Sequence, residues 1–129
     1  MAAASDDPTD DPAVAAALAD DLTIDITTIG RRSGERRRIE IWFLNVDGRI
    51  FITGTPGRRD WMANLLAEPR FTFHLKESVT ADLDAEARPV DDEPTRRLVI
   101  EHAVATWYRA QTSVDDLIES APMVEVTFV

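Results

Sequence analysis

The stretch "LTIDITTIGRRSGERRRIEIWFLNVDGRIFITG", residues 22–54, sets out three strands of the expected fold and the two turns between them. Apolar and polar residues alternate over 22–29, which predicts a half-buried strand. Residues 38–46 predict a second strand that is apolar on both faces near its end. Asp47-Gly48 is a strong hairpin signal, so residues 49–54 are expected to pair back on the second strand.

The remaining sequence continues this pattern of short strands, with helices between and around them. Further strands are expected over 70–75, 79–90 and 123–129, and helices over 12–21, 61–68 and 91–110 and after Ser113. Strands joined mostly by hairpins predict a largely antiparallel sheet. Six short strands leave two costly edges if the sheet stays open, so we expect the sheet to curl into a barrel flanked by about four helices.

Local signals also predict several element ends. Asp60 is expected to be the N-cap of the helix that follows it, and Ser113 with Asp116 forms a capping box for the last helix. His74 lies opposite the Phe71 and Phe73 face of its strand, which favours a histidine at the surface or at an interface.

The composition limits the class of protein. With 129 residues and 44% hydrophobic residues, the chain fits one folded domain, expected over residues 12–129. The small, acidic residues 1–11 predict a disordered tail. The sequence has no cysteine and only two histidines, so we expect no metal site. It has neither a secretory signal nor an apolar run of about 20 residues, so we expect a cytoplasmic protein without a membrane span.

Positive charge is concentrated in one turn of an acidic chain. The net charge is -10, but residues 31–38 hold five arginines and one glutamate, so the rest of the chain sums to -14. Glycines flank Arg31, Arg32 and Ser33, and arginine matches phosphate or carboxylate with paired hydrogen bonds. The turn therefore indicates a site for an anionic ligand, with a solvated charged loop as the alternative. Nucleic acid is disfavoured, because the chain lacks a broad basic face.

A second loop, "TGTPGRRDW" (residues 53–61), also favours an anionic or polar ligand. It combines two glycines, a proline and two arginines, and it runs into the expected start of a helix. Backbone N–H groups at such a position suit a phosphate or the polar edge of a ring. A plain turn is the alternative.

Three segments carry a resemblance to a known family: "TTIGRRSGERRR" (27–38), "IWFLNVDGRIFITG" (41–54) and "RRDWMANLLAEPRFTFHL" (58–75), with a weaker likeness in "PMVEVTFV" (122–129). They resemble the deazaflavin-dependent nitroreductases, within the split β-barrel flavin and deazaflavin oxidoreductases. The resemblance implies an α+β fold, namely a split β-barrel of the pyridoxamine-phosphate-oxidase or FMN-binding type. It also implies a site for coenzyme F420, a deazaflavin with a phosphate and an oligoglutamate tail.

The resemblance assigns roles by position. Arg31, Arg32 and Ser33 would hold the phosphate and tail, and Trp42 matches an aromatic position beside the ring. The implied cofactor-binding residues are Arg31, Arg32, Ser33, Gly34, Arg37, Trp42, Gly54, Thr55, Pro56, Gly57 and Arg58, with Arg59 as a further contact of the tail. The helix residues Trp61, Asn64 and Leu65 match the family in positions that favour packing. Glu40 stands where the family usually has proline, and the loop before Trp61 is several residues shorter, which leaves FMN as the alternative cofactor.

The implied reaction transfers a hydride from reduced F420 to an electron-poor acceptor, which is a quinone, a nitro compound or an activated alkene. Trp107 and Tyr108 would cover the substrate side, and Tyr108 is a candidate proton donor; anchoring of the helix is the alternative role of Trp107. The alternatives for the whole protein are a non-catalytic flavin- or deazaflavin-binding protein and an FMN-dependent oxidoreductase of the same fold. A homodimer is a possible assembly.

Overall fold

The structure is a computed structural model that describes residues 8–129. The predicted disordered tail lies partly outside the described residues, which begin at Pro8. Within them, Pro8–Asp10 form the short 3-10 helix η1, and Asp11 caps helix α1 (Pro12–Asp20) by accepting a hydrogen bond of 2.8 Å from the Ala13 N–H. Residues 8–11 of the predicted tail therefore form η1 and the cap of α1, and the disorder expected of residues 1–11 stays a prediction.

Seven strands and, besides the 3-10 turns, five α-helices make up the described part of the chain, against the expected six strands and four helices. The strands are β1 (Thr23–Ile29), β2 (Arg36–Trp42), β3 (Leu44–Val46), β4 (Arg49–Thr53), β5 (Arg70–Leu75), β6 (Ala81–Pro89) and β7 (Met123–Phe128). The further helices are α2 (Asp60–Ala67), α3 (Glu93–Glu101), η2 (Ala103–Ala105), α4 (Thr106–Gln111) and α5 (Val114–Ser120).

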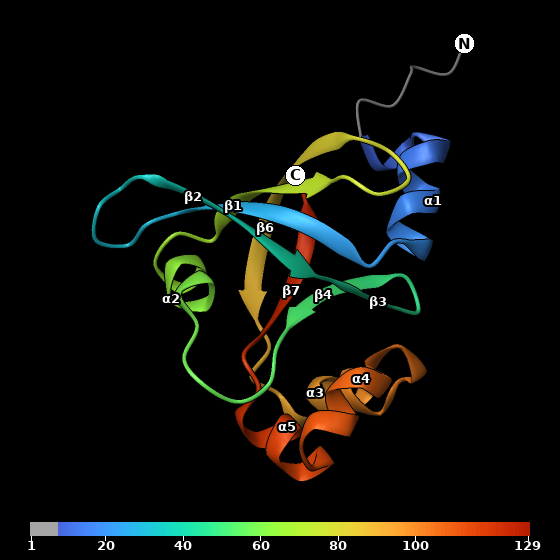
Figure 1. Cartoon of the computed structure of the whole chain (residues 1–129), viewed down its shortest axis with the longest axis vertical. Coiled ribbons are helices and arrows are strands. Elements are labelled where there is room, and N and C mark those ends of the chain that lie inside the picture. The colour runs from blue at the N-terminus through green and yellow to red at the C-terminus, as the bar shows by residue number, and fades with distance from the viewer. Residues whose placement is uncertain (1–7) are drawn as a thin grey trace.

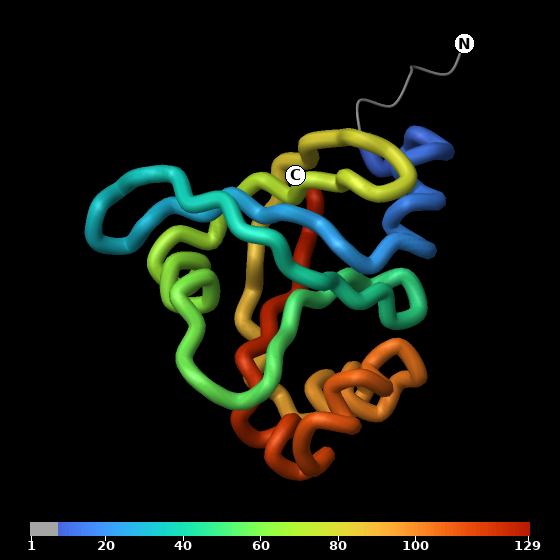
Figure 2. The backbone as a smooth tube through the Cα atoms, in the orientation of Figure 1, coloured from blue at the N-terminus to red at the C-terminus, as the bar shows by residue number. Residues whose placement is uncertain are grey.

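All seven strands form one sheet in the order β2-β1-β5-β6-β7-β4-β3, and every neighbouring pair is antiparallel. The two edge strands, β2 and β3, are consecutive in the chain and are separated only by Phe43. The sheet must therefore curl until its edges approach each other, and Figure 2 shows the chain running from one edge strand directly into the other. The predicted single strand over 38–46 is two strands, because the chain changes its pairing partner at Phe43.

Two hydrophobic cores lie on either side of the curled sheet. The first lies inside the curl and includes Ile24 and Ile26 of β1, Phe73 of β5, and Trp61 and Leu65 of α2. The second joins β3, β4 and β7 to helices α3, α4 and α5, which gather at one end of the molecule in Figure 1. Helix α2 lies beside the β1–β2 hairpin, away from those three helices. The strand alternation predicted for β1 is confirmed, since its buried and half-buried residues alternate along the whole strand.

The predicted helix over 91–110 is broken at His102. His102 has an extended backbone (φ -67°, ψ 149°), and its ring Nδ1 accepts a hydrogen bond of 3.2 Å from the Val104 N–H. Arg109 donates to the carbonyls of Ile100 (2.7 Å) and His102 (2.6 Å), which satisfies backbone groups that the break leaves free. These caps come from side chains at irregular spacing, so hydrophobic periodicity did not indicate the break.

The other predicted caps have mixed outcomes. Ser113 caps α5 and accepts a hydrogen bond from the Asp116 N–H, as expected. Asp60 is not an N-cap: it is the first residue of α2, and the cap residue is Arg59, whose side chain makes no capping bond. No helix in the described residues is long and apolar enough to cross a membrane.

Candidate functional site

The arginine turn is the loop that joins β1 to β2, residues 30–35. It is closed by backbone hydrogen bonds from Gly30 N–H to the Glu35 carbonyl (2.7 Å) and from Gly34 N–H to the Gly30 carbonyl (2.8 Å). Gly34 has a φ of +70°, a conformation that side chains rarely adopt. At Gly30 an added Cβ would lie 2.6 Å from the Ser33 Oγ and 3.3 Å from the Glu35 carbonyl, so a larger residue there would have to displace the Ser33 side chain. The turn is therefore tightly folded.

A cavity of about 500 Å³ opens between this turn and helix α2. Its lining residues are Thr28, Gly30, Arg31, Arg32, Ser33, Arg37, Ile39, Asp60, Trp61 and Asn64. Three guanidinium groups and one carboxylate thus share its wall with an indole and an aliphatic side chain. Such a wall can hold an anionic group at the guanidinium side and an apolar group at the Trp61 side.

The three cavity arginines differ in how firmly they are held. Arg31 is held by two partners: its Nη1 donates to the Asn64 Oδ1 at 2.9 Å and its Nη2 contacts the Asp60 Oδ1 at 3.3 Å. Arg37 lies 3.4 Å from the Glu35 carboxylate. Arg32 is exposed and has no hydrogen bond or ion pair with any residue that the structure describes. The wall therefore offers one fixed guanidinium and one that is free to meet a ligand.

Other residues predicted for the cofactor site lie outside the cavity wall. Gly34 lies at the turn itself, and the loop from Gly54 to Gly57 folds around an arginine of its own segment. Arg59 Nη2 donates to the Thr55 carbonyl (3.0 Å) and to its hydroxyl (3.1 Å). Arg59 is thus engaged within its own loop, whereas the Arg58 side chain is exposed and forms no hydrogen bond or ion pair with a described residue. Pro56 is half-buried in this loop.

The predicted aromatic residues form a separate cluster near the second core. Trp107 lies edge-on against Trp42, with ring centroids 5.3 Å apart, and against Tyr108 at 5.1 Å. Trp107 is 49% exposed and Tyr108 only 5% exposed. Burial raises the pKa of Tyr108 to about 12, since the phenolate form is poorly solvated there. The structure does not bring these three rings into the wall of the arginine cavity.

Six residues of the cavity wall were not among the predicted cofactor-binding residues: Thr28, Gly30, Ile39, Asp60, Trp61 and Asn64. For two of them a signal was present. Trp61 and Asn64 are three residues apart, so they share one face of α2. Neither residue could be assigned to the arginine turn from the sequence, because the packing of α2 beside β1 is a tertiary contact.

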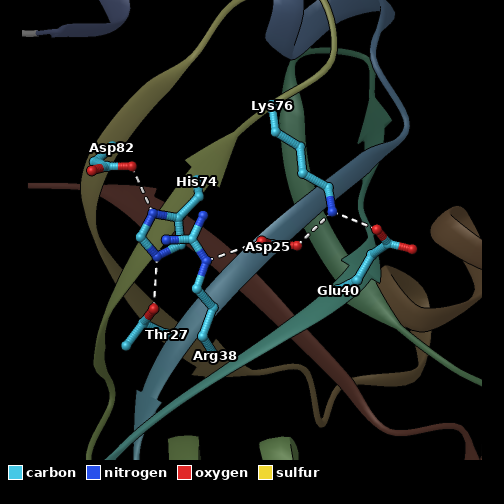
Figure 3. A network of polar contacts seen from close by, with 7 residues as sticks. All are labelled: Asp25, Thr27, Arg38, Glu40, His74, Lys76 and Asp82. Carbon is cyan, nitrogen blue, oxygen red and sulfur yellow. Dashed lines mark hydrogen bonds and ion pairs between the residues drawn. The ribbon is translucent and has the colours of Figure 1, made fainter.

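A second polar cluster lies on the other face of β1 and β5, and Figure 3 shows it. His74 is 6% exposed; its Nδ1 lies 2.6 Å from the Asp82 carboxylate and its Nε2 lies 2.7 Å from the Thr27 hydroxyl. His74 was predicted to lie at the surface or at an interface. A surface position is wrong, because side chains of the two neighbouring strands, β1 and β6, cover the ring. The other histidine, His102, caps η2, and its ring Nε2 lies 3.3 Å from the Asp47 carboxylate.

The same cluster contains a bridge between three strands. Asp25 of β1 accepts hydrogen bonds from Lys76 (2.7 Å) and from Arg38 of β2 (3.0 Å), and Lys76 also bonds Glu40 of β2 (Figure 3). These bonds, above all the one from Lys76, lower the pKa of Asp25 below its ordinary value. The cluster ties β2, β1 and the end of β5 together on the face opposite the arginine cavity.

The curled antiparallel sheet is the split β-barrel fold of the pyridoxamine-phosphate-oxidase or FMN-binding type, as predicted. Solved structures with this fold include a pyridoxamine 5'-phosphate oxidase-like protein of Listeria innocua (12% identity, TM-score 0.66, 89% of this chain and 90% of that one). An FAD-binding protein of Mesorhizobium loti has 12% identity and a TM-score of 0.66 over 89% of this chain and 86% of that one. An F420-H2 dependent reductase, FDR-A, has 18% identity and a TM-score of 0.55 over 82% and 93%.

The family is shown by the sequence itself. The model of the F420H(2)-dependent quinone reductase family matches residues 11–119, which is most of the chain. The chain belongs to this family and is an F420H2-dependent oxidoreductase. The resemblance stated from the sequence, and the enzyme class that it implied, are thereby confirmed.

Proposed function

We propose that the cavity beside the arginine turn binds the phosphate and glutamate tail of F420. The observation that carries the proposal is the gathering of Arg31, Arg32, Arg37 and Ser33 at one cavity of a chain with a net charge of -10. A cavity wall with three guanidinium groups suits a ligand with several negative charges, because arginine binds phosphate and carboxylate through charge-assisted hydrogen bonds. The residues present therefore fit the anionic part of the coenzyme.

The remaining predicted residues extend the proposed site from this anchor. The glycine loop from Gly54 to Gly57 and Trp42 would lie at the deazaflavin ring, and Trp107 with Tyr108 would lie on the acceptor side. When bound, reduced F420 supplies the hydride. The protein orients the ring through the anchored tail and keeps water from it with aromatic side chains. A tyrosine hydroxyl is protonated at neutral pH, and burial raises the pKa of Tyr108 further, to about 12, so Tyr108 can donate a hydrogen bond or a proton to the acceptor.

The proposed acceptor is an electron-poor molecule: a quinone, a nitro compound or an activated alkene. No dedicated acid–base pair is needed for hydride transfer to such an acceptor, and the cavity wall contains only one carboxylate, which is paired to Arg31. A homodimer stays a prediction for this chain.

The test combines Arg31→Ala with Arg32→Ala and measures F420 affinity by fluorescence titration. If the turn holds the anionic tail, binding weakens by at least ~2 kcal/mol, because each charge-assisted hydrogen bond contributes about 1.5–3 kcal/mol. The control removes the same charge elsewhere: Arg70→Ala with Arg97→Ala, two exposed arginines of β5 and α3. FMN is titrated in parallel. Unchanged F420 affinity in the turn variant, or tight binding of FMN without binding of F420, contradicts the proposal.

Turnover is measured with the same proteins. The wild type should consume reduced F420 only when a quinone, nitroarene or enone is added, and the acceptor that gives the highest kcat/KM identifies the substrate class. Binding of F420 without turnover across this panel would contradict the proposed acceptors.

A further inference from the structure

Asn64 is a buried polar residue in the middle of helix α2, and it is 5% exposed. Asparagine is a poor residue for a helix interior, because its side chain competes for backbone hydrogen bonds. Burying its amide is also costly unless the amide is hydrogen-bonded. An asparagine buried inside helix α2 is therefore expected only where its amide forms hydrogen bonds that the fold or the site needs.

The partners of Asn64 all belong to the arginine cavity. Its Oδ1 accepts two hydrogen bonds from Arg31, one from the backbone N–H at 3.1 Å and one from Nη1 at 2.9 Å. Its Nδ2 donates to the hydroxyl of Thr28 at 3.3 Å, and that hydroxyl is buried on β1. The single amide therefore joins the helix, the first strand and the arginine turn.

These contacts hold Arg31 at two levels. The bond to the backbone N–H fixes the start of the turn, and the bond to Nη1 fixes the direction of the guanidinium. With Asp60 engaging Nη2, two of the five N–H groups of Arg31 are used and three stay available for a ligand. An amide can do this without cancelling the positive charge, which a buried carboxylate at the same place would do.

We propose that Asn64 is a positioning residue for the cofactor: it aims the Arg31 guanidinium at the anionic part of F420. The inference rests on the proposed function of the cavity. Asn64 acts through Arg31 and not on the deazaflavin ring, so its loss should weaken only that part of the affinity which depends on the phosphate and tail. Thr28 supports this role, because its hydroxyl fixes which end of the amide faces the arginine.

The test compares two probes: F420 and the same deazaflavin chromophore without phosphate and glutamates. In Asn64→Leu, which keeps the size but removes both bonds to Arg31, the Kd for F420 should rise about tenfold. The Kd for the chromophore should change by less than about twofold, since its binding does not use the arginine. Salt and pH are held constant, and the thermal unfolding midpoint of each variant is recorded.

Met62→Ala is the matched control for general loosening of the helix. Met62 lies on α2 and packs against the first core, but it does not line the cavity. This variant should lower the unfolding midpoint without changing the ratio of the two dissociation constants. If Asn64→Leu does not fold, Thr28→Val takes its place: it removes only the hydroxyl that orients the amide, and F420 alone should weaken, by about threefold.

The outcomes separate this inference from the proposed function. If the Arg31 and Arg32 double variant selectively loses F420 but Asn64→Leu and Thr28→Val weaken both probes equally or neither, the site stands and the positioning role of Asn64 is overturned. If the double variant itself does not discriminate between the probes, the proposed function of the cavity fails first.

Discussion

At the level of single residues, the pKa of the Tyr108 hydroxyl can be measured directly by titration. Burial raises its pKa to about 12, since the phenolate form would lose solvation. The chain contains only one tyrosine, so its ultraviolet titration reports this group alone. We expect the absorbance of phenolate to develop with a midpoint about two units above the value of about 10 for a solvated tyrosine.

The stability should follow the same group. The folded pKa is raised, so the contribution to the free energy of unfolding is fully present below about pH 10 and is lost as the pH rises through about 12. Tyr108→Phe should lack this part of the alkaline decline. A titration midpoint near 10 in the folded protein would show that the hydroxyl is solvated, and it would contradict a pKa raised by burial.

The residues of the site that the sequence predicted are those whose neighbours are local. Arg31, Arg32 and Ser33 lie in one short turn, and Arg37 follows on the adjoining strand, so their proximity needs no tertiary information. Asn64 was expected to serve in packing, because nothing in its own segment shows that the helix lies against the turn. His74 was misjudged for the same reason: strand alternation places it on the outer face but does not show what covers that face.

At the level of helices and strands, Arg96 of α3 links this helix to α5 and to the loop before α3. It donates to the carbonyls of Val90 (2.8 Å) and Ala121 (2.6 Å) and also to the last turn of α5. The guanidinium thus satisfies the C-terminal carbonyls of α5 and the loop before α3. Its neighbour Arg97 only makes ion pairs with Glu93 and Glu101 on the same helix face.

Arg96→Met should therefore lower the free energy of unfolding by about 2 kcal/mol, since several hydrogen bonds to a charged group are lost together. Arg97→Met should lower it by less than about 0.5 kcal/mol, because exposed ion pairs one helical turn apart contribute little. Urea unfolding of both variants measures the difference. Equal losses would show that the bonds of Arg96 to the carbonyls contribute no more than a surface ion pair.

The sequence predicted the strands and turns well where a local pattern determines them. It predicted them poorly where a contact with a distant segment of the chain determines where an element ends. The hairpin at Asp47-Gly48 and the strand over Arg70–Leu75 followed from turn residues and alternation. The break between β2 and β3 at Phe43 did not follow from the local pattern. It exists because β2 pairs with β1, whereas β3 pairs with β4. The break at His102 likewise depends on an imidazole cap and on Arg109, neither of which alters the hydrophobic period.

For the whole molecule, a curled and largely antiparallel sheet followed from the count and pattern of short strands, and the split-barrel type followed from the family resemblance. The strand order followed from neither. The sheet places β5 between β1 and β6 and leaves β3 at the opposite edge from β2, although those edge strands are adjacent in the chain. The antiparallel pairing of β5 with β1 places the start of β5, and helix α2 just before it, beside the end of β1 from which the arginine turn leaves, and the cavity lies between them. The site is thus a consequence of topology as well as of the arginine-rich segment.

The charge of the whole molecule opposes the proposed ligand while the turn attracts it, and salt should separate the two effects. Exposed Asp115 and Glu119 lie on α5, in the helical layer apart from the turn (Figure 1), and form no ion pair with a described residue. Asp115→Asn with Glu119→Gln should strengthen F420 binding about twofold near 0.01 M ionic strength, where the screening length is about 30 Å. At 0.15 M, where that length is about 8 Å, the gain should vanish.

The loss of F420 affinity caused by removing Arg31 and Arg32 should persist at both ionic strengths, because contacts inside a cavity are screened less. A gain from the α5 variant that is independent of salt would indicate a change of conformation, and it would refute long-range repulsion as the opposing force.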